Sequence, residues 1–168
     1  MVSQLRHMFT GILAAAAVCA ALPALPQPMP AGQPVLVISG KVGGPAGSVP
    51  LDLAALEALP QHSFTTGTPW SKAPQKFTGP LLRDVLRLAK AHGSSLKAMA
   101  LNDYQVTIPM EDAQQENVIV ALRIDGKPIP VRERGPLFVI YPFDSKPQLQ
   151  SQRYYERSIW QLKSIVAE

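Results

Sequence analysis

The first half of the chain combines apolar runs typical of strands with two spacings typical of helices. "VLVISG", from Val35 to Gly40, is a β-branched run that ends at a glycine, and "HSFTT" alternates, so both predict strands. In "LDLAALEALP" the leucines recur at helical spacing after Asp52, a good helix cap, and Pro60 ends the pattern. The clearest helical stripe lies in "FTGPLLRDVLRLAKAHG", where Pro80 suits the first turn. These patterns predict strands and two short helices.

The second half of the chain changes to alternation and short buried-type runs, which indicate β-structure. "LKAMAL" and "YQVTIP" flank the turn dipeptide "ND", and "NVIVALRI" meets "KPIPV" through "DG", a strong hairpin signal. "LFVIYP" is typical of a buried strand, and "SIWQLKSIVA" alternates well enough for a last strand. Together with the first half, this predicts an α+β domain with mixed β-sheets, few short helices and long loops.

The N-terminal segment does not fit this domain and predicts export. Arg6 and His7 precede the uncharged apolar run "MFTGILAAAAVCAAL", and the Pro-rich stretch "PALPQPMPAGQP" follows. A basic start, a short apolar core and small residues before a break are typical of a secretory signal peptide, and the run is short for a transmembrane span. We expect a signal peptide over residues 1–24, a Pro-rich linker over 25–33 and one domain over 34–168. An uncleaved membrane anchor is the alternative.

Composition excludes several kinds of chemistry. The only cysteine is Cys19, within the predicted signal peptide, so the mature domain would have neither a thiolate nor a disulfide. The net charge is +4, without a basic run interleaved with aromatics, so we expect no nucleic-acid partner. His62 and His92 lack a partner histidine at ligand spacing, and phosphate-binding and nucleophile motifs are absent. We therefore expect no catalytic residue and no metal ligand.

Polar and aromatic residues concentrate in four predicted loops, which contain "TTGTPW", "LNDYQV", "VRERGPLFVIYPFD" and "YYERSIW". Aromatic walls with a few fixed donors and acceptors suit flat rings with polar edges, such as pterins. Asp103 could accept from an amino-pyrimidine edge, and Arg134 or Arg157 could meet oxygens of the ring or its side chain. Each residue alone is equally typical of core packing, a turn or a solvated edge. The candidate ligand-binding residues are Thr66, Trp70, Asn102, Asp103, Tyr104, Arg132, Arg134, Tyr141, Arg157 and Trp160.

Four stretches, in order, resemble the molybdopterin-binding domain of the sulfite-oxidase type. "FTGPLLRDVL" resembles its aromatic-Gly helix start, and "ALNDYQVTIPMEDA" resembles its Asp-Gly-Tyr segment with the following strand. "VIVALRIDGKPIPVRERGPLFVIYP" is similar to its two apolar strands, and "RSIWQLKSI" to its closing strand. The order holds from Phe64 to Ile165. The resemblance implies the mixed-sheet fold of that family and a pterin or molybdopterin-like ligand.

The chain departs from that family at the metal ligand. The family provides a cysteine thiolate to molybdenum a few residues before a tryptophan, and alignment on Trp70 places Thr66 or its neighbours there. A threonine hydroxyl is not a soft, readily ionised ligand, so we do not expect molybdenum. The family's glycine after the aspartate is missing in Asn102–Tyr104, and Arg134 stands before Gly135, where a histidine is common.

Short cysteine-free periplasmic proteins of this type include pterin-binding regulators of a membrane enzyme that makes and degrades cyclic-di-GMP. The resemblance to them implies a periplasmic, ligand-responsive regulator whose partner is the periplasmic domain of a membrane diguanylate cyclase/phosphodiesterase. Two alternatives stay open: a molybdenum-cofactor-dependent oxidoreductase or its subunit, and a non-catalytic periplasmic structural module. Enzymatic activity is left open, and the missing cysteine argues against it.

Overall fold

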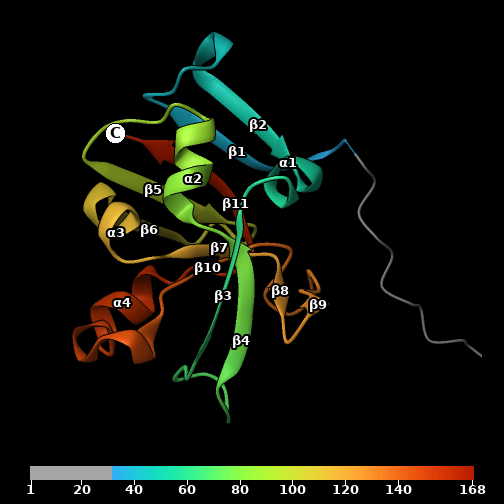
Figure 1. Cartoon of the computed structure of the whole chain (residues 1–168). Helices are drawn as coiled ribbons and strands as arrows, with labels where there is room; N and C mark the ends of the chain where they lie inside the picture. Colours follow the sequence, from blue (N-terminus) through green and yellow to red (C-terminus); the bar gives the residue numbers. More distant parts are fainter. Residues whose placement is uncertain (1–31) are drawn as a thin grey trace, which may run out of the picture.

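The computed structural model describes residues 32–168 of the chain (Figure 1). The predicted signal peptide, over residues 1–24, and nearly all of the predicted linker lie outside this range. The described part has an α+β fold, as predicted, in which three β-sheets combine with short helices. Within residues 32–168, no helix is long and apolar enough to cross a membrane.

The largest sheet has five strands in the order β2–β1–β11–β5–β6. Strands β1 and β11 pair in parallel at its centre, and the other neighbours pair in antiparallel fashion. The predicted first strand, the hairpin around "ND" and the last strand are confirmed. The strands are β1 (Pro34–Gly40), β2 (Ser48–Asp52), β5 (Ser95–Ala100), β6 (Gln105–Pro109) and β11 (Leu162–Ala167).

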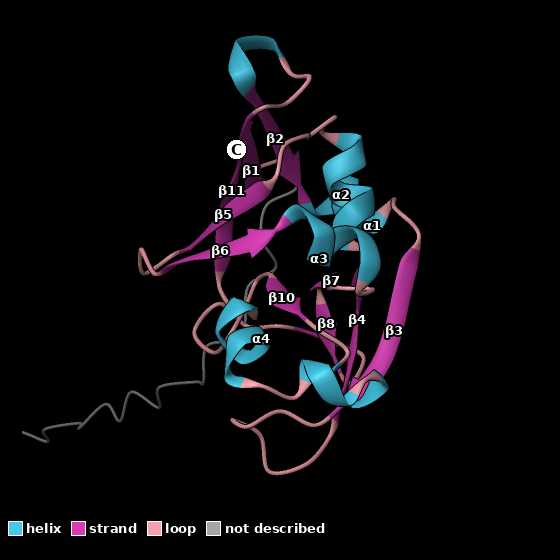
Figure 2. Cartoon of the chain, turned by 90° about the vertical axis from the view of Figure 1, so that its left-hand side faces the viewer, coloured by secondary structure: helices cyan, strands magenta, loops and turns pink. Residues whose placement is uncertain are grey.

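Three helices lie on one face of this sheet: α1 (Leu53–Glu57), α2 (Leu82–Leu88) and α3 (Met110–Gln115) (Figures 1 and 2). The predicted cap of α1 is confirmed, because Asp52 Oδ1 accepts a 2.8 Å hydrogen bond from the Ala55 amide. Each of the three helices contributes buried side chains to the core that it shares with the sheet.

The second predicted helix begins later than the sequence pattern suggests. Gln75–Pro80 form strand β4, which pairs in antiparallel fashion with β3 (Gln61–Thr66), and α2 starts only after it. At Gly79 a Cβ atom would lie 2.0 Å from the carbonyl oxygen of Val120, so the strand passes too close to its neighbour for any side chain. Pro80 therefore ends a strand, and the prediction that it opens a helix was wrong.

Two smaller sheets lie below the first in the view of Figure 1. One has the order β3–β4–β8–β9, in which β8 (Arg123–Ile124) and β9 (Lys127–Pro128) are joined by a two-residue turn. Both turn residues, Asp125 and Gly126, have positive φ, which confirms the hairpin predicted from "DG". The other pairs β7 (Ile119–Ala121) with β10 (Phe138–Ile140), and both strands are fully buried.

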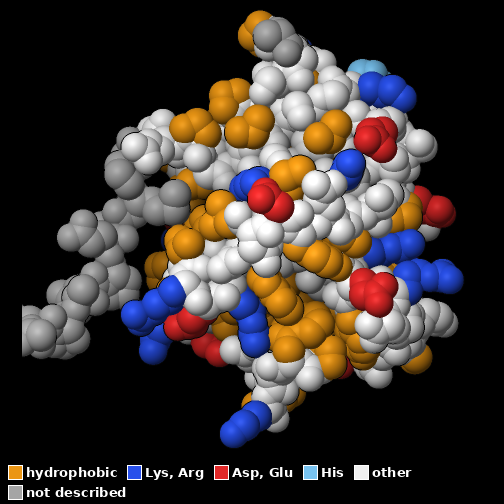
Figure 3. All heavy atoms as spheres, turned by 180° about the vertical axis from the view of Figure 1, so that it is seen from behind, with side chains coloured by type: hydrophobic (Ala, Val, Ile, Leu, Met, Phe, Trp, Pro, Cys, Tyr) orange, Lys and Arg blue, Asp and Glu red, His pale blue; other side chains and the backbone are white. Residues whose placement is uncertain are grey.

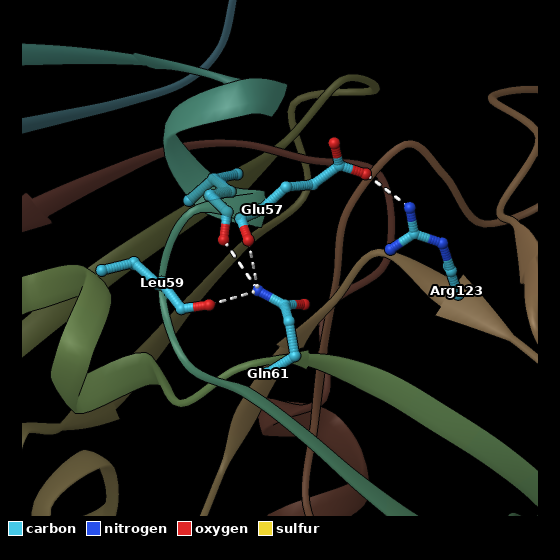
Figure 4. Close-up of polar contacts among 5 residues, drawn as sticks. Glu57, Leu59, Gln61 and Arg123 are labelled. Atoms are coloured by element: carbon cyan, nitrogen blue, oxygen red, sulfur yellow. Dashed lines mark hydrogen bonds and ion pairs between the residues drawn. The ribbon is translucent and has the colours of Figure 1, made fainter.

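A polar network joins α1 to strands β3 and β8 (Figure 4). The side-chain amide of Gln61 donates to the carbonyls of Leu56 and Leu59 at 2.9 and 2.8 Å, which satisfies acceptors that the helix leaves free at its end. Arg123 forms an ion pair with Glu57. Exposed pairs contribute little stability, so we infer that this contact mainly fixes where the β8–β9 hairpin lies.

The fourth helix, α4 (Gln152–Arg157), lies below α3 and apart from α1 and α2 (Figures 1 and 2). It follows the 3-10 turns Phe143–Ser145 and Pro147–Leu149, and η1 (Pro45–Gly47) is a further 3-10 turn. Helices α3 and α4 were not predicted: the residues of α4 were assigned to a loop, and no element was assigned to those of α3.

Candidate ligand-binding site

Trp70, in the loop between β3 and β4, lies within a cluster of aromatic rings. The ring centroids of Phe138, Phe143, Tyr155 and Trp160 lie between 5.6 and 6.3 Å from its own. Three of these four rings meet the indole almost at right angles, an arrangement that the aromatic quadrupole favours. The cluster therefore fixes the long β3–β4 loop against β10, α4 and the segment before β11.

A pocket of about 390 Å³ opens beside this cluster, and we call it the aromatic pocket. Hydrophobic side chains gather in the lower half of the face shown in Figure 3. None of the lining residues is basic, and the only charged one is Glu156. The aromatic pocket is lined by the β3–β4 loop, the β5–β6 turn, α4 and the segment after it: Pro69, Trp70, Ala100, Asn102, Tyr104, Gln152, Tyr155, Glu156, Ser158, Ile159 and Trp160.

Four of the ten candidate residues line the aromatic pocket: Trp70, Asn102, Tyr104 and Trp160. Asn102 Oδ1 accepts a 3.2 Å hydrogen bond from the Tyr104 amide, which closes the turn after β5. The Tyr104 hydroxyl donates to the Glu156 carbonyl at 3.4 Å and so joins this turn to α4. The structure thus brings both tryptophans and this turn together around one pocket.

Asp103, Arg132 and Arg134 do not line the aromatic pocket. Asp103 has a left-handed backbone, with φ of 65°, and its exposed carboxylate forms an ion pair with Lys163 at 2.6 Å. Arg132 is exposed. Arg134 donates a 3.2 Å hydrogen bond to the Trp70 carbonyl and lines a second pocket, which Trp70 also lines.

Thr66 is fully buried at the end of β3 and does not line the aromatic pocket. Its hydroxyl oxygen accepts a 3.0 Å hydrogen bond from the Asp144 amide. The next amide, of Gly67, donates to the Asp144 carboxylate at 2.7 Å. The start of "TTGTPW" is therefore held against the segment after β10, and Thr66 supports the wall that Trp70 forms.

Tyr141 and Arg157 meet at a buried carboxylate, that of Asp112. The Tyr141 hydroxyl and the Arg157 guanidinium each donate to Asp112 Oδ2 at 2.7 Å. Burial, followed by the neighbouring carboxylate, raises the pKa of Tyr141 far above its ordinary value, so the hydroxyl keeps its proton. Because Asp112 lies on α3 and Arg157 ends α4, these contacts fix α4 where it lines the aromatic pocket.

The sequence prediction missed several residues of this site. Tyr155, Gln152 and Glu156 lie on α4, which was treated as a loop, so no helical face was assigned to them. Asp112 was also missed, although the sequence carries a signal for it. It stands between Met110 and Ala113, and an acidic residue among buried helix positions usually has a partner.

The described residues do not bring metal-ligating side chains together. No group of three or more His, Cys, Asp or Glu side chains within residues 32–168 is placed to hold a metal ion. The one cysteine of the sequence, Cys19, lies outside this range.

Comparison with known families shows to which family the chain belongs. A family model described as the oxidoreductase molybdopterin binding domain matches residues 35–144. A comparison with curated proteins gives no match. The matched residues run from β1 to the segment after β10 and include Trp70 and the β5–β6 turn, whereas α4 and Trp160 follow them. Since the match covers more than half of the chain and the fold is α+β, the chain belongs to the oxidoreductase molybdopterin-binding domain family.

Proposed function

We propose that this protein binds a pterin in the aromatic pocket and does so without molybdenum. The observation that carries the proposal is the pocket itself, about 390 Å³ in volume, with Trp70, Tyr104, Tyr155 and Trp160 among its lining residues. Pockets of this size and aromatic character suit a flat bicyclic ring, which stacks on side chains of this kind.

The donor set supports the pterin and not the metal. Molybdenum in this fold takes a cysteine thiolate, and residues 32–168 contain no cysteine. At the position that the sequence comparison assigns to that ligand, Thr66 is buried and its hydroxyl oxygen already accepts the Asp144 amide. A hydroxyl in this position is neither soft nor ionised. The aromatic wall needs no metal to bind the ring.

The polar groups of the pocket suit the amino-pyrimidine edge of a pterin. Glu156 supplies a carboxylate that accepts from ring N–H groups, and Asn102 supplies an amide. Without a basic lining residue, the pocket has no group that would pair with a phosphate. The ligand that this pocket fits best is therefore a pterin without a phosphate group. Glu156 takes the role that the sequence assigned to Asp103.

Titration of reduced and oxidised pterins onto the full chain by calorimetry tests this proposal. We expect saturable binding, which Trp160→Ala weakens about tenfold or more, because about 1.4 kcal/mol of lost ring contact is a factor of ten. Glu156→Gln should weaken it by a smaller factor, because exposed charges at a rim contribute less than about 1 kcal/mol.

Asp103→Asn is the matched control for Glu156→Gln, because Asp103 is an exposed carboxylate that does not line the pocket and asparagine tolerates its left-handed backbone, so the affinity should stay unchanged. The absence of saturable binding to folded protein would overturn the proposal and leave the structural-module alternative. Elemental analysis of protein from a cofactor-competent host completes the test. A molybdenum-to-protein ratio near one would contradict the metal-free proposal.

The physiological role we propose is that of a periplasmic regulator of a membrane enzyme of cyclic-di-GMP turnover. The support is the sequence resemblance to short cysteine-free regulators and the signal-like N-terminus. Regulation requires that the pterin-bound and the pterin-free protein have different affinities for the partner. If the two affinities were equal, pterin binding would not change the amount of complex with the partner. We expect the partner's periplasmic domain to bind with an affinity that changes on pterin addition. Equal affinity in both conditions would contradict this role.

A further inference from the structure

A second, larger pocket lies on another side of Trp70. It has a volume of about 650 Å³, and we call it the hairpin pocket, because the β8–β9 hairpin forms part of its wall. The β3–β4 loop and residues 129–134 complete it. The Arg123–Glu57 pair described above ties the hairpin to α1 (Figure 4). The wall is therefore built from elements that other contacts hold in place.

Two basic residues and one acidic residue line the hairpin pocket. Lys127 and Arg134 line it, and within the part of the chain that the structure describes neither forms an ion pair. Arg134 donates one amino group to the Trp70 carbonyl at 3.2 Å, which orients the guanidinium and leaves its other donors available. Glu133 is the only acidic lining residue. An oxyanion is the group that two such cations bind best.

Two lining residues of the hairpin pocket also have polar atoms without a partner. Trp70 Nε1 and Gln75 Oε1 are buried and form no hydrogen bond with any of residues 32–168. Buried polar atoms in proteins are nearly always satisfied, by protein, water or ligand, and an exception calls for an explanation such as strain or a bound water. Because both atoms are inaccessible to solvent, they lie behind the surface of the wall, and the polar contacts of a bound molecule fall to Lys127 and Arg134.

Apolar side chains form the rest of this wall, among them Ile124, Ile129 and Pro130. We propose that the hairpin pocket is a binding site for a small organic anion, in which a flat apolar body packs on these residues. Its carboxylate or phosphate group meets Arg134 and Lys127. The site is separate from the aromatic pocket, although Trp70 lines both, and the proposal does not depend on pterin binding.

The probes that test this are benzoate and phenyl phosphate, with benzyl alcohol as the neutral analogue and inorganic phosphate as the anion without a body. The readout is the NMR signal of the Trp70 indole N–H. The sequence has only two tryptophans, so this signal is readily assigned. We expect benzoate, phenyl phosphate or both to shift this signal saturably. The stronger of the two identifies the anionic group. Benzyl alcohol and inorganic phosphate should bind at least about tenfold more weakly.

Lys127→Gln and Arg134→Gln should each weaken binding of the organic anion severalfold, whereas Lys97→Gln, at an exposed lysine outside the pocket, should not. Lys127 is exposed and forms no ion pair with the described residues, so its variant tests the site even if Arg134→Gln disturbs the loop. The proposal is overturned by no saturable shift with either organic anion, or by binding that Lys127→Gln leaves unchanged. Inorganic phosphate as tight as phenyl phosphate would also overturn it, because the apolar wall would then contribute nothing.

Discussion

Trp70→Ala is expected to lower the free energy of unfolding by about 3 kcal/mol and to abolish measurable pterin binding. The indole contacts four aromatic rings from three other parts of the chain, so its removal leaves a cavity where these parts meet. It also removes a wall of the aromatic pocket. Urea unfolding measures the first effect, and calorimetric titration of the folded variant measures the second.

Trp70→Phe and Trp160→Ala separate the two roles of this indole. Trp70→Phe keeps a ring in the cluster and should retain most of the stability. Trp160 is 38% exposed, so Trp160→Ala should cost less stability than Trp70→Ala while still impairing the pocket. If Trp70→Ala unfolded at the same urea concentration as the native protein, the indole would not be part of the packed core.

Asp112→Ala is expected to lower the free energy of unfolding by about 3 kcal/mol, because it leaves the Arg157 guanidinium without its partner in a largely buried place. It also removes the acceptor of the Tyr141 hydroxyl. Since Arg157 fixes the end of α4, we expect weaker pterin binding as well, although Asp112 does not line the aromatic pocket. Urea unfolding and pterin titration measure the two effects.

Asp84→Ala is the matched control, because Asp84 also lies on a short helix and pairs with an arginine, Arg87, whose side chain is 74% exposed. The Asp84 side chain is 13% exposed, close to the 11% of Asp112, but Arg87 stays solvated when its partner is removed, so the free energy of unfolding should change by less than about 1 kcal/mol. Equal effects of the two substitutions would show that the Asp112 contacts behave as an ordinary surface pair.

Much of the fold was predictable, because local patterns agreed with it. The "DG" turn, the Asp52 cap and the alternating strands are signals that act over a few residues. The start of α2 was not predictable in this way. Locally, "FTGP" fits a helix start. In the structure it is part of a strand, and residue 79 must be glycine because the carbonyl of Val120, distant in sequence, leaves no room for a side chain.

The candidate site was predictable in its aromatic residues and less so in its charged ones. Trp70, Tyr104 and Trp160 line one pocket, as expected for loop aromatics that converge. Asp103 turns outward to Lys163, because its left-handed backbone and a half-buried lysine on β11 decide its direction. Arg157 and Tyr141 meet Asp112 instead of a ligand. No sequence pattern predicts which arginine will pair with a buried carboxylate on another helix.

The placement of the two tryptophans has an optical consequence. Trp70 and Trp160 are the only tryptophans of the chain, and their ring centroids lie 5.6 Å apart at an interplanar angle of 77°. Indoles this close and this far from parallel share their electronic excitation, which splits their circular dichroism into bands of opposite sign. A ligand that turns one of them changes that splitting. The protein therefore carries an intrinsic exciton pair that reports the geometry of its pocket without a label.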